Sequence, residues 1–268
     1  MNVDILEFQE IIWQKGRELF REMPWRTDTR PYYVMVSEIM LQQTQVERVI
    51  PKFTAFVERF PSVEHVANAT LEEVLQMWSG LGYNRRAKFL HEAAIKITSE
   101  YNGVFPHTEK ELVSLPGVGV NTAGAILAYG FNVPSIFIET NIRTVYFYHF
   151  FLEHDEVSDA ELRAIVESTT DIEHPREWYW AMMDYGSYLK RQGIGQNKKS
   201  RHYKKQSPLK GSVREIRGQI LKLLTTADFE EQKLRTELVA DERFESAIAS
   251  LQKEGLIAKT GQTFHLKR

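Results

Sequence analysis

The sequence contains no cysteine. This absence excludes disulfide bonds, thiolate zinc sites, cysteine-ligated iron–sulfur clusters and cysteine nucleophiles. A long apolar run is also missing at the N-terminus, because Met1 to Met23 alternates charged and apolar residues at helical spacing. We therefore expect an amphipathic helix there, neither a signal peptide nor a membrane span, and a cytoplasmic location.

The chain also lacks a large excess of charge of either sign. Its 268 residues carry a formal net charge of -2, and 43% of them are hydrophobic, as in an ordinary globular protein of two or three small domains. Acidic residues are absent between Asp184 and Glu215. We call this interval the basic stripe, after its basic residues: Lys190, Arg191, Lys198, Lys199, Arg201, Lys204, Lys205, Lys210 and Arg214.

Helix signals are frequent along the chain. Ser/Thr-x-x-Glu segments typical of a capping box begin at Thr70, Thr108, Ser158 and Ser212. Helical periodicity fills Thr70–Trp78, Arg85–Tyr101 and Asn121–Tyr129, whereas alternating strand patterns are scarce. The sequence thus predicts an all-α body.

The C-terminal part has a different pattern. Residues 193–211 are rich in Gly and basic residues, which indicates a linker or an extended DNA-facing arm. Helices are predicted over Val213–Leu224, near Glu230–Val239 and over Glu242–Glu254, followed by a hairpin around Thr260-Gly261. This order predicts a small winged-helix-like module at 212–268, of a type that binds either DNA or protein.

A Gly-x-Gly turn lies between two predicted helices in Leu115-Pro116-Gly117-Val118-Gly119. Glycine allows the backbone to come close to a ligand, and the following helix adds its positive end, so the turn can bind a phosphate. The alternative is a plain helix connection with glycine as a C-cap.

The order of motifs narrows the family. Five motifs occur in this order: Pro24-Trp25-Arg26, Ser37–Val46, Gly80-Leu81-Gly82-Tyr83, the glycine turn and Ala181–Asp184. With these motifs, the sequence resembles the bacterial adenine DNA glycosylases (MutY-like) of the helix-hairpin-helix DNA glycosylase superfamily. The resemblance covers roughly residues 20 to 190. It implies a two-domain helical fold, with a bundle at 23–131 that carries the hairpin and a second domain formed by 1–22 plus 132–192, with the active site between them.

Glu38 is the first candidate catalytic residue. It lies in the apolar helical run Val36–Leu41, where burial would raise its pKa and suit it to general acid catalysis. In the resembling family, the glutamate at this place protonates a ring nitrogen of the flipped adenine. The alternative is a surface or capping glutamate.

The second candidate carboxylate is Glu139, where the resembling family has the aspartate of Asp-Gly-Asn. That carboxylate stabilises the oxocarbenium-like sugar. Glu139 adds a methylene and Thr140 replaces the glycine, which implies a re-tuned site, a different substrate base or lost activity. Asn141 matches its family counterpart and is expected to orient Glu139 or a water, or to cap the next helix.

Asn121 occupies the position of the lysine that attacks the sugar in bifunctional members of the superfamily. Without an amine, no Schiff base is expected. The enzyme is therefore predicted to be monofunctional, with water as the nucleophile.

The resemblance also implies a DNA surface. Gln42 and Gln43 would fill the gap left by the flipped base, and Tyr83 would stack beside it unless it packs in the core. Arg85, with Arg86 and Lys88, would hold phosphate, unless these charges only form a solvated helix face. The remaining predicted contacts are Arg26, Thr44, Gly117, Val118, Gly119, Asn121 and Thr122. Lys198, Lys199 and Arg201 of the basic stripe would replace the phosphate contacts of the family's iron–sulfur loop, unless the stripe is only a polar linker.

Partners and cofactors follow from these assignments. We expect a monomer that binds double-stranded DNA with a mispaired or damaged base, without a membrane, metal or iron–sulfur cluster; a monovalent ion at the hairpin carbonyls is compatible with the motif. The usual C-terminal domain that senses 8-oxoguanine is replaced by the short winged-helix-like tail.

The sequence leaves three functions open. The leading one is a monofunctional base excision repair glycosylase that flips and removes adenine mispaired with guanine or 8-oxoguanine. The first alternative changes the base to uracil, thymine or another modified base, because of Glu139, Asn121 and the missing sensor domain. The second is a non-catalytic DNA-binding protein on the same scaffold.

Overall fold

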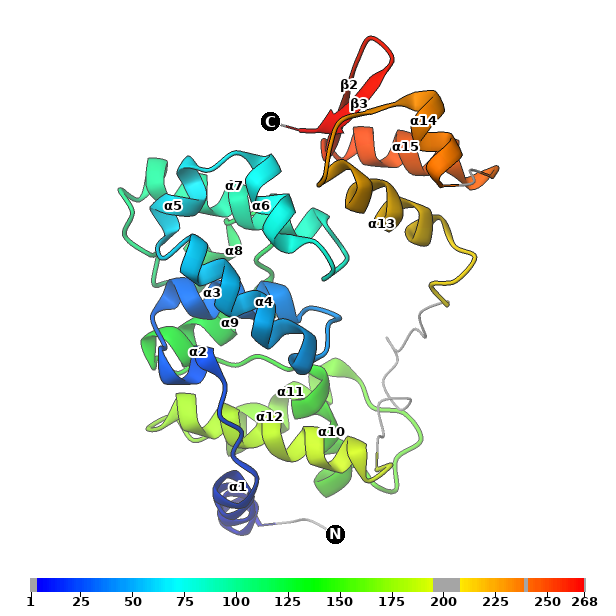
Figure 1. Cartoon of the computed structure of the whole chain (residues 1–268). Coiled ribbons are helices and arrows are strands. Elements are labelled where there is room, and N and C mark those ends of the chain that lie inside the picture. The colour runs from blue at the N-terminus through cyan, green and yellow to red at the C-terminus, as the bar shows by residue number, and fades with distance from the viewer. Residues whose placement is uncertain (1–3, 195–207, 239–240, 268) are drawn as a thin grey trace. The chain divides into compact units, whose positions relative to one another are not determined.

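The computed structural model describes residues 4–194, 208–238 and 241–267. Contacts divide the chain into two compact units (Figure 1). Among the described residues, the first unit combines 4–38, 107–114 and 118–194, and the second combines 39–106, 115–117, 208–238 and 241–267. The domain boundaries expected at residues 22, 131, 192 and 211 stay predictions.

The described helices and strands follow one another in this order: α1 (Ile5–Leu19), α2 (Pro24–Thr27), α3 (Pro31–Leu41), α4 (Val46–Arg59), α5 (Val63–Asn68), α6 (Leu71–Trp78), α7 (Arg85–Glu100), α8 (Glu109–Val113), α9 (Val120–Ala125), the π-helix η1 (Ile126–Phe131), α10 (Thr140–Phe150), α11 (Asp159–Thr169), α12 (Pro175–Arg191), α13 (Val213–Leu224), β1 (Phe229–Glu230), α14 (Glu231–Glu237), α15 (Arg243–Lys253), β2 (Ile257–Thr260) and β3 (Thr263–Leu266). The predicted helical body with a small C-terminal α/β module is confirmed.

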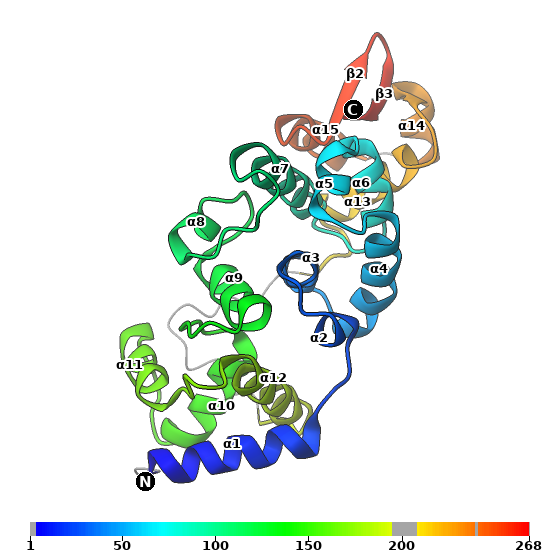
Figure 2. The same ribbon diagram turned by 90° about the vertical axis from the view of Figure 1, so that its left-hand side faces the viewer.

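The core of the first unit forms where α1 and α10 pack against α12 (Figure 2). Phe8 and Ile12 of α1 are fully buried, and the Phe8 ring lies 5.3 Å from the Tyr146 ring of α10. A Cβ on Gly16 would lie only 2.6 Å from the Cβ of Ala181, so glycine permits the close approach of α1 to α12. No helix in the described ranges has the length and apolar character of a membrane span.

Helices α4 to α7 form one helical part of the second unit. The α4 residues Val49, Phe53 and Phe56 are buried, and the Phe56 ring meets the Trp78 ring of α6 edge-on at 6.3 Å. Thr70 begins α6 with the predicted capping box, since its hydroxyl accepts from the Glu73 N–H while the Glu73 carboxylate accepts from the Thr70 N–H.

The C-terminal module of the second unit has the predicted winged-helix order. Helix α13 packs on α15, and the antiparallel sheet has the strand order β1-β3-β2, with Ile257 opposite Leu266. Strand β1 was not predicted, because two residues are too short to show an alternating pattern.

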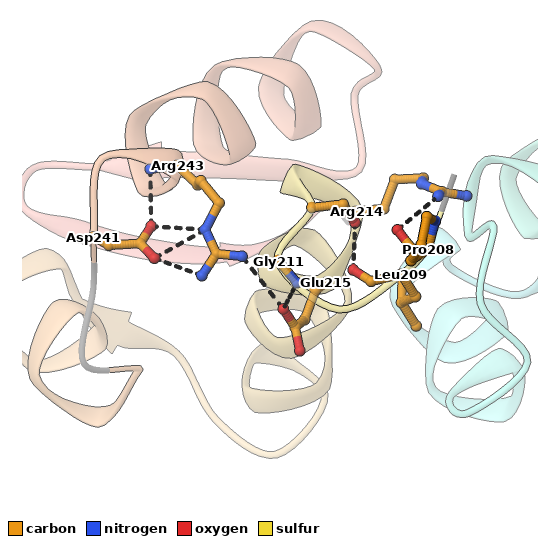
Figure 3. Close-up of polar contacts among 8 residues, drawn as sticks. Pro208, Leu209, Gly211, Arg214, Glu215, Asp241 and Arg243 are labelled. Carbon is orange, nitrogen blue, oxygen red and sulfur yellow. Dashed lines mark hydrogen bonds and ion pairs between the residues drawn. The ribbon is translucent and has the colours of Figure 1, made fainter. Parts of the chain in front are cut away.

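The capping box predicted at Ser212 is wrong, although α13 does begin at Val213. The Ser212 hydroxyl donates to the carbonyl oxygen of Leu209 at 2.6 Å instead of capping the helix. The Glu215 carboxylate accepts from the Gly211 N–H at 2.8 Å and pairs with Arg243 at 3.3 Å (Figure 3). The Glu215 carboxylate that a capping box would use is therefore bound by the nearby Gly211 N–H and by Arg243 of α15.

Candidate active site

Glu38 lies on α3, whose neighbouring side chains are almost all in the core. Protein packing holds the helix on nearly every side, because its buried residues include Val34, Met35, Val36, Ile39 and Met40. The Glu38 side chain is densely surrounded by protein atoms but keeps part of its surface accessible. Burial raises the pKa of its carboxyl well above the usual range, the negative charge of Glu139 raises it further, and the positive charge of Arg26 opposes both effects. The surface-glutamate alternative does not fit this environment.

Glu139 is the N-cap residue of α10, in extended conformation with φ -87° and ψ 168°. Burial raises the pKa of its carboxyl too, and its side chain remains partly accessible. Glu38 and Glu139 belong to the same unit, and each lies within the electrostatic reach of the other. Two interacting carboxylates cannot both ionise without repulsion, so the pair retains a proton to higher pH than an isolated glutamate.

Tyr129 is a third titratable group at this place, and nothing in its sequence context singled it out from an ordinary core aromatic. Its ring meets the Phe137 ring edge-on at 5.9 Å and stacks on the Trp180 ring at 6.4 Å. Burial, Glu38 and Glu139, in that order, raise the pKa of its hydroxyl well above the usual range. The hydroxyl therefore stays protonated beside the two carboxylates.

Tyr129 belongs to the π-helix η1, which departs from the α-helix predicted over Asn121–Tyr129. The next residue, Gly130, packs on Pro31, the first residue of α3, so closely that an added Cβ would lie 3.1 Å from the Pro31 Cα. π-helical turns are rare and occur often at functional sites. This one brings Tyr129 to the helix that carries Glu38.

Arg26 was predicted to contact DNA, but the structure places its guanidinium in a buried ion pair with Asp184. It also lies between two rings, 5.4 Å from the centre of Phe20 and 5.3 Å from that of Trp180. Arg26 therefore acts on the site through its charge rather than from an exposed surface.

The two asparagines near Glu139 have different partners. Asn141 is not the N-cap of α10, because Glu139 holds that position. Its amide donates to the Met183 carbonyl at 3.3 Å and accepts from the Lys190 ammonium at 3.2 Å. Asn121, which is exposed, pairs with the main chain of Ile138. Both side chains hold the segment that carries Glu139.

The hairpin predicted at Leu115–Gly119 does connect helices α8 and α9. Gly117 has a φ of 77°, and a Cβ there would lie 2.7 Å from the Phe89 Cβ, so this position requires glycine. Val118 and Thr122 are buried, whereas Gly119 is exposed. Any DNA contact at this turn would thus come from main-chain amides and not from the side chains of Val118 and Thr122.

Two turns in the second unit hold the residues predicted to enter the DNA. Gln43 and Tyr83 both have positive φ, at 56° and 47°, which is uncommon for residues with a side chain and typical of functional loops. Tyr83 is 38% exposed, so its core-packing alternative is wrong. One hollow is lined by six of the residues with a predicted DNA contact, namely Gln42, Gln43, Tyr83, Arg85, Arg86 and Gly117.

Arg86 joins these two turns, although its predicted role is to bind phosphate. It is buried, and its Nη1 donates to the carbonyl oxygens of Ile39 at 2.8 Å, Met40 at 2.9 Å and Gln42 at 2.6 Å. Its Nη2 donates to the Thr44 hydroxyl at 3.0 Å and to the Gly82 carbonyl at 3.1 Å. The phosphate assignment for Arg86 is therefore wrong, because the side chain is buried and both of its Nη groups donate within the protein.

Lys198, Lys199 and Arg201 lie outside the described residues, so their predicted DNA contacts stay predictions. Among the described residues, no group of three or more His, Asp or Glu could hold a metal ion.

The sequence matches known proteins over the region just described. Residues 36–168 match the family model of the HhH-GPD superfamily base excision DNA repair proteins. The matched segment contains Glu38, Asn121, Glu139 and Asn141. It does not include Arg26 and Asp184.

Curated relatives of this chain include the adenine DNA glycosylase of Buchnera aphidicola subsp. Baizongia pistaciae, which is 37% identical over 170 residues, 63% of this chain and 48% of that protein. The adenine DNA glycosylase of Mus musculus is 35% identical over 228 residues, 81% of this chain and 44% of that protein. The chain thus spans about half the length of the curated relatives that it matches.

The HhH-GPD fold is also found among solved structures. A thermostable thymine-DNA glycosylase superposes with a TM-score of 0.62 at 23% identity, covering 68% of this chain and 86% of that one. At this identity the likeness concerns the fold alone. The predicted helix-hairpin-helix glycosylase fold and the resemblance to adenine DNA glycosylases are confirmed.

Proposed function

We propose that this protein is a base excision repair glycosylase that removes adenine mispaired with guanine or 8-oxoguanine from double-stranded DNA. The observation that carries the proposal is the pair Glu38 and Glu139, two densely surrounded carboxyl groups within electrostatic reach of each other. Burial raises the pKa of both groups, and the charge of Glu139 raises the pKa of Glu38 further. Glycoside cleavage uses such a pair, one carboxyl as acid and the other as a charged stabiliser. Adenine is favoured because curated relatives at 35–37% identity are named adenine DNA glycosylases.

In the proposed reaction, protonated Glu38 gives its proton to a ring nitrogen of the flipped base. The bond between that base and C1′ of the sugar then breaks, and its electron pair leaves with the protonated base. Ionised Glu139 stabilises the positive charge that develops on the sugar. Water adds to C1′ and loses a proton, which leaves an intact strand with an abasic site.

Base flipping would depend on the two turns that Arg86 joins. Gln42 or Gln43 would fill the space of the extruded base, and the exposed Tyr83 ring would stack on its neighbour. Their backbone is held in place before DNA arrives, because Arg86 donates to carbonyl oxygens of both turns. Such pre-organisation reduces the ordering that accompanies binding.

We further propose that the enzyme is monofunctional, because Asn121 offers no amine at the position of the superfamily's lysine. Borohydride reduction during turnover tests this point, since it traps a Schiff base as a covalent protein–DNA complex. We expect no trapped complex. If one forms, its loss in a Lys190→Met variant would identify the amine, because the Lys190 ammonium bonds to Asn141. We also propose that no metal takes part, so a chelator should leave the rate unchanged.

One experiment tests the main proposal. The protein is incubated with duplexes that contain adenine opposite guanine, adenine opposite 8-oxoguanine, uracil, or thymine opposite guanine, and the products are heated with alkali to break abasic strands. Breaks confined to the adenine mispairs support the proposal, and Glu38→Gln should abolish them.

Breaks at uracil or thymine would instead support a different substrate base, which the replacement of aspartate by Glu139 makes worth testing. A protein that binds all the duplexes but produces no breaks would overturn the enzymatic function. Size measurement in solution, with and without DNA, tests the expected monomer.

A further inference from the structure

The side chain of Asn121 makes a two-point pairing with the main chain of Ile138. Its Nδ2 donates to the Ile138 carbonyl oxygen at 3.1 Å, and its Oδ1 accepts from the Ile138 N–H at 3.2 Å. One side chain thus satisfies both main-chain polar groups of the residue that directly precedes Glu139.

The segment that leads to Glu139 has no regular structure of its own between η1 and α10. Phe137 is held by packing, because its ring lies 4.1 Å from the Tyr179 ring and its Cβ would lie 2.8 Å from a Cβ on Gly124. Ile138 is only partly buried, so packing constrains it less. The pairing with Asn121 therefore fixes the last peptide before Glu139.

Few side chains could make this pairing. The asparagine amide carries a donor and an acceptor side by side, like a peptide group. A lysine has donors only and would leave the Ile138 N–H without its acceptor, an aspartate has acceptors only, and a leucine of similar size has neither. The residue type at position 121 thus matches what the main chain of Ile138 presents.

We propose that Asn121 is a positioning residue, which sets the place of the Glu139 carboxylate relative to Glu38 by holding the main chain of Ile138. This inference rests on the proposed function. It also gives a role to Asn121, which stands where bifunctional members of the superfamily have a lysine, beside the replacement of the family's aspartate by Glu139. Glu139 has one methylene more than aspartate, and a displacement of about 1 Å at a reacting centre can cost about 10²-fold in rate. Holding its backbone limits that displacement.

A double-mutant cycle tests the proposal. Single-turnover excision rates and DNA dissociation constants are measured for wild type, Asn121→Leu, Glu139→Gln and the double variant. We expect Asn121→Leu to lower the rate about 10- to 100-fold with a nearly unchanged dissociation constant. In the Glu139→Gln background it should have little further effect, because its role acts through Glu139. Asn121→Gln, which keeps the amide, should recover part of the rate.

Val120→Ala is the matched control, since Val120 is the exposed neighbour of Asn121 on the same helix. It should leave the excision rate unchanged. A weaker dissociation constant with an unchanged rate in Asn121→Leu would overturn the proposal in favour of a direct DNA contact. Equal rate losses in both backgrounds would overturn it as well, because Asn121 would then act independently of Glu139.

A second measurement does not depend on activity. Amide hydrogen exchange of the Ile138 N–H should be at least about 10-fold faster in Asn121→Leu than in wild type, at an unchanged global melting temperature. Unchanged exchange would show that the pairing does not hold in solution and would overturn the proposal. If wild type removes no base at all, the proposed function fails, while the exchange data still decide whether Asn121 holds Ile138.

Discussion

Arg26 and Asp184 form a buried ion pair that joins the start of the chain to α12. The Arg26 Nη1 lies 2.6 Å from the Asp184 Oδ2, and these side chains are only 5% and 1% exposed. Arg21 adds its Nε at 2.7 Å from the Asp184 Oδ1. Two guanidinium groups thus share one carboxylate, which leaves one net positive charge in the cluster, and the charge of Arg26 reaches Glu38.

Replacing Asp184 by Asn should destabilise the fold strongly. Arg26 would remain buried without its counter-charge, and loss of one partner of a buried pair costs about 3–5 kcal/mol. Chemical denaturation measures this change in the free energy of unfolding. Asp159→Asn is the control, because the Arg143–Asp159 pair has a similar distance of 2.8 Å but Asp159 is 52% exposed. The control should lose less than about 1 kcal/mol, and equal losses would contradict the importance of burial.

Replacing Glu38 by Gln should remove activity and increase stability at neutral pH. The pKa of Glu38 is raised in the folded protein, so its protonated form contributes to the free energy of unfolding. This contribution is fully present below the unfolded pKa of about 4.3 and is lost as pH rises through the folded pKa. Gln does not titrate and escapes this loss. The melting temperature of the variant should exceed that of wild type by a few degrees near pH 7.5 and match it near pH 4.

The same raised pKa predicts the pH dependence of excision. General acid catalysis requires protonated Glu38, so the single-turnover rate should fall as pH rises through the folded pKa of this group. The Glu38→Gln variant should lose about 10²- to 10⁴-fold in rate. A wild-type rate that increases across neutral pH would contradict the assignment of Glu38 as the acid.

Replacing Arg86 by Lys should loosen the two turns that hold Gln43 and Tyr83. Lysine has a single nitrogen and cannot serve five acceptors spread over the end of α3 and two turns, so carbonyl oxygens lose their donors. We expect a loss of about 2–4 kcal/mol in stability and weaker DNA binding. Arg85→Lys, at the exposed neighbouring position, should change the stability by less than about 0.5 kcal/mol. Equal stability of the two variants would contradict this role.

Replacing Lys198, Lys199 and Arg201 by Ala should flatten the salt dependence of DNA binding. Each phosphate contact contributes about -0.9 to the slope of log K against log salt, so the loss of three would reduce its magnitude by about 2–3. The measurement is a titration of affinity between about 50 and 200 mM salt. The triple variant of the exposed residues Arg17, Arg163 and Lys253 is the control. An unchanged slope would show that the basic stripe is only a linker.

Helix positions were predictable wherever short-range signals act alone. Helix α13 has the predicted bounds Val213–Leu224, and the capping boxes of Thr70 and Ser158 form as expected. The box at Ser212 does not form, since Arg243 and the Gly211 N–H compete for Glu215. The π-helix at Ile126–Phe131 was not predicted, because its hydrophobic pattern does not differ from that of a buried α-helix.

By itself, the amino-acid sequence determined the helical fold, the absence of cysteine chemistry and the choice of Glu38 and Glu139, because periodicity, caps and ordered motifs are properties of neighbouring residues. Only the tertiary structure decided what Arg26, Arg86, Asn121 and Tyr129 do. Their partners lie far away in the sequence, as Asp184 does for Arg26 and Ile138 for Asn121. A charged or polar side chain looks the same in a sequence whether it faces DNA or a buried carbonyl, and folding alone determines which of these it meets.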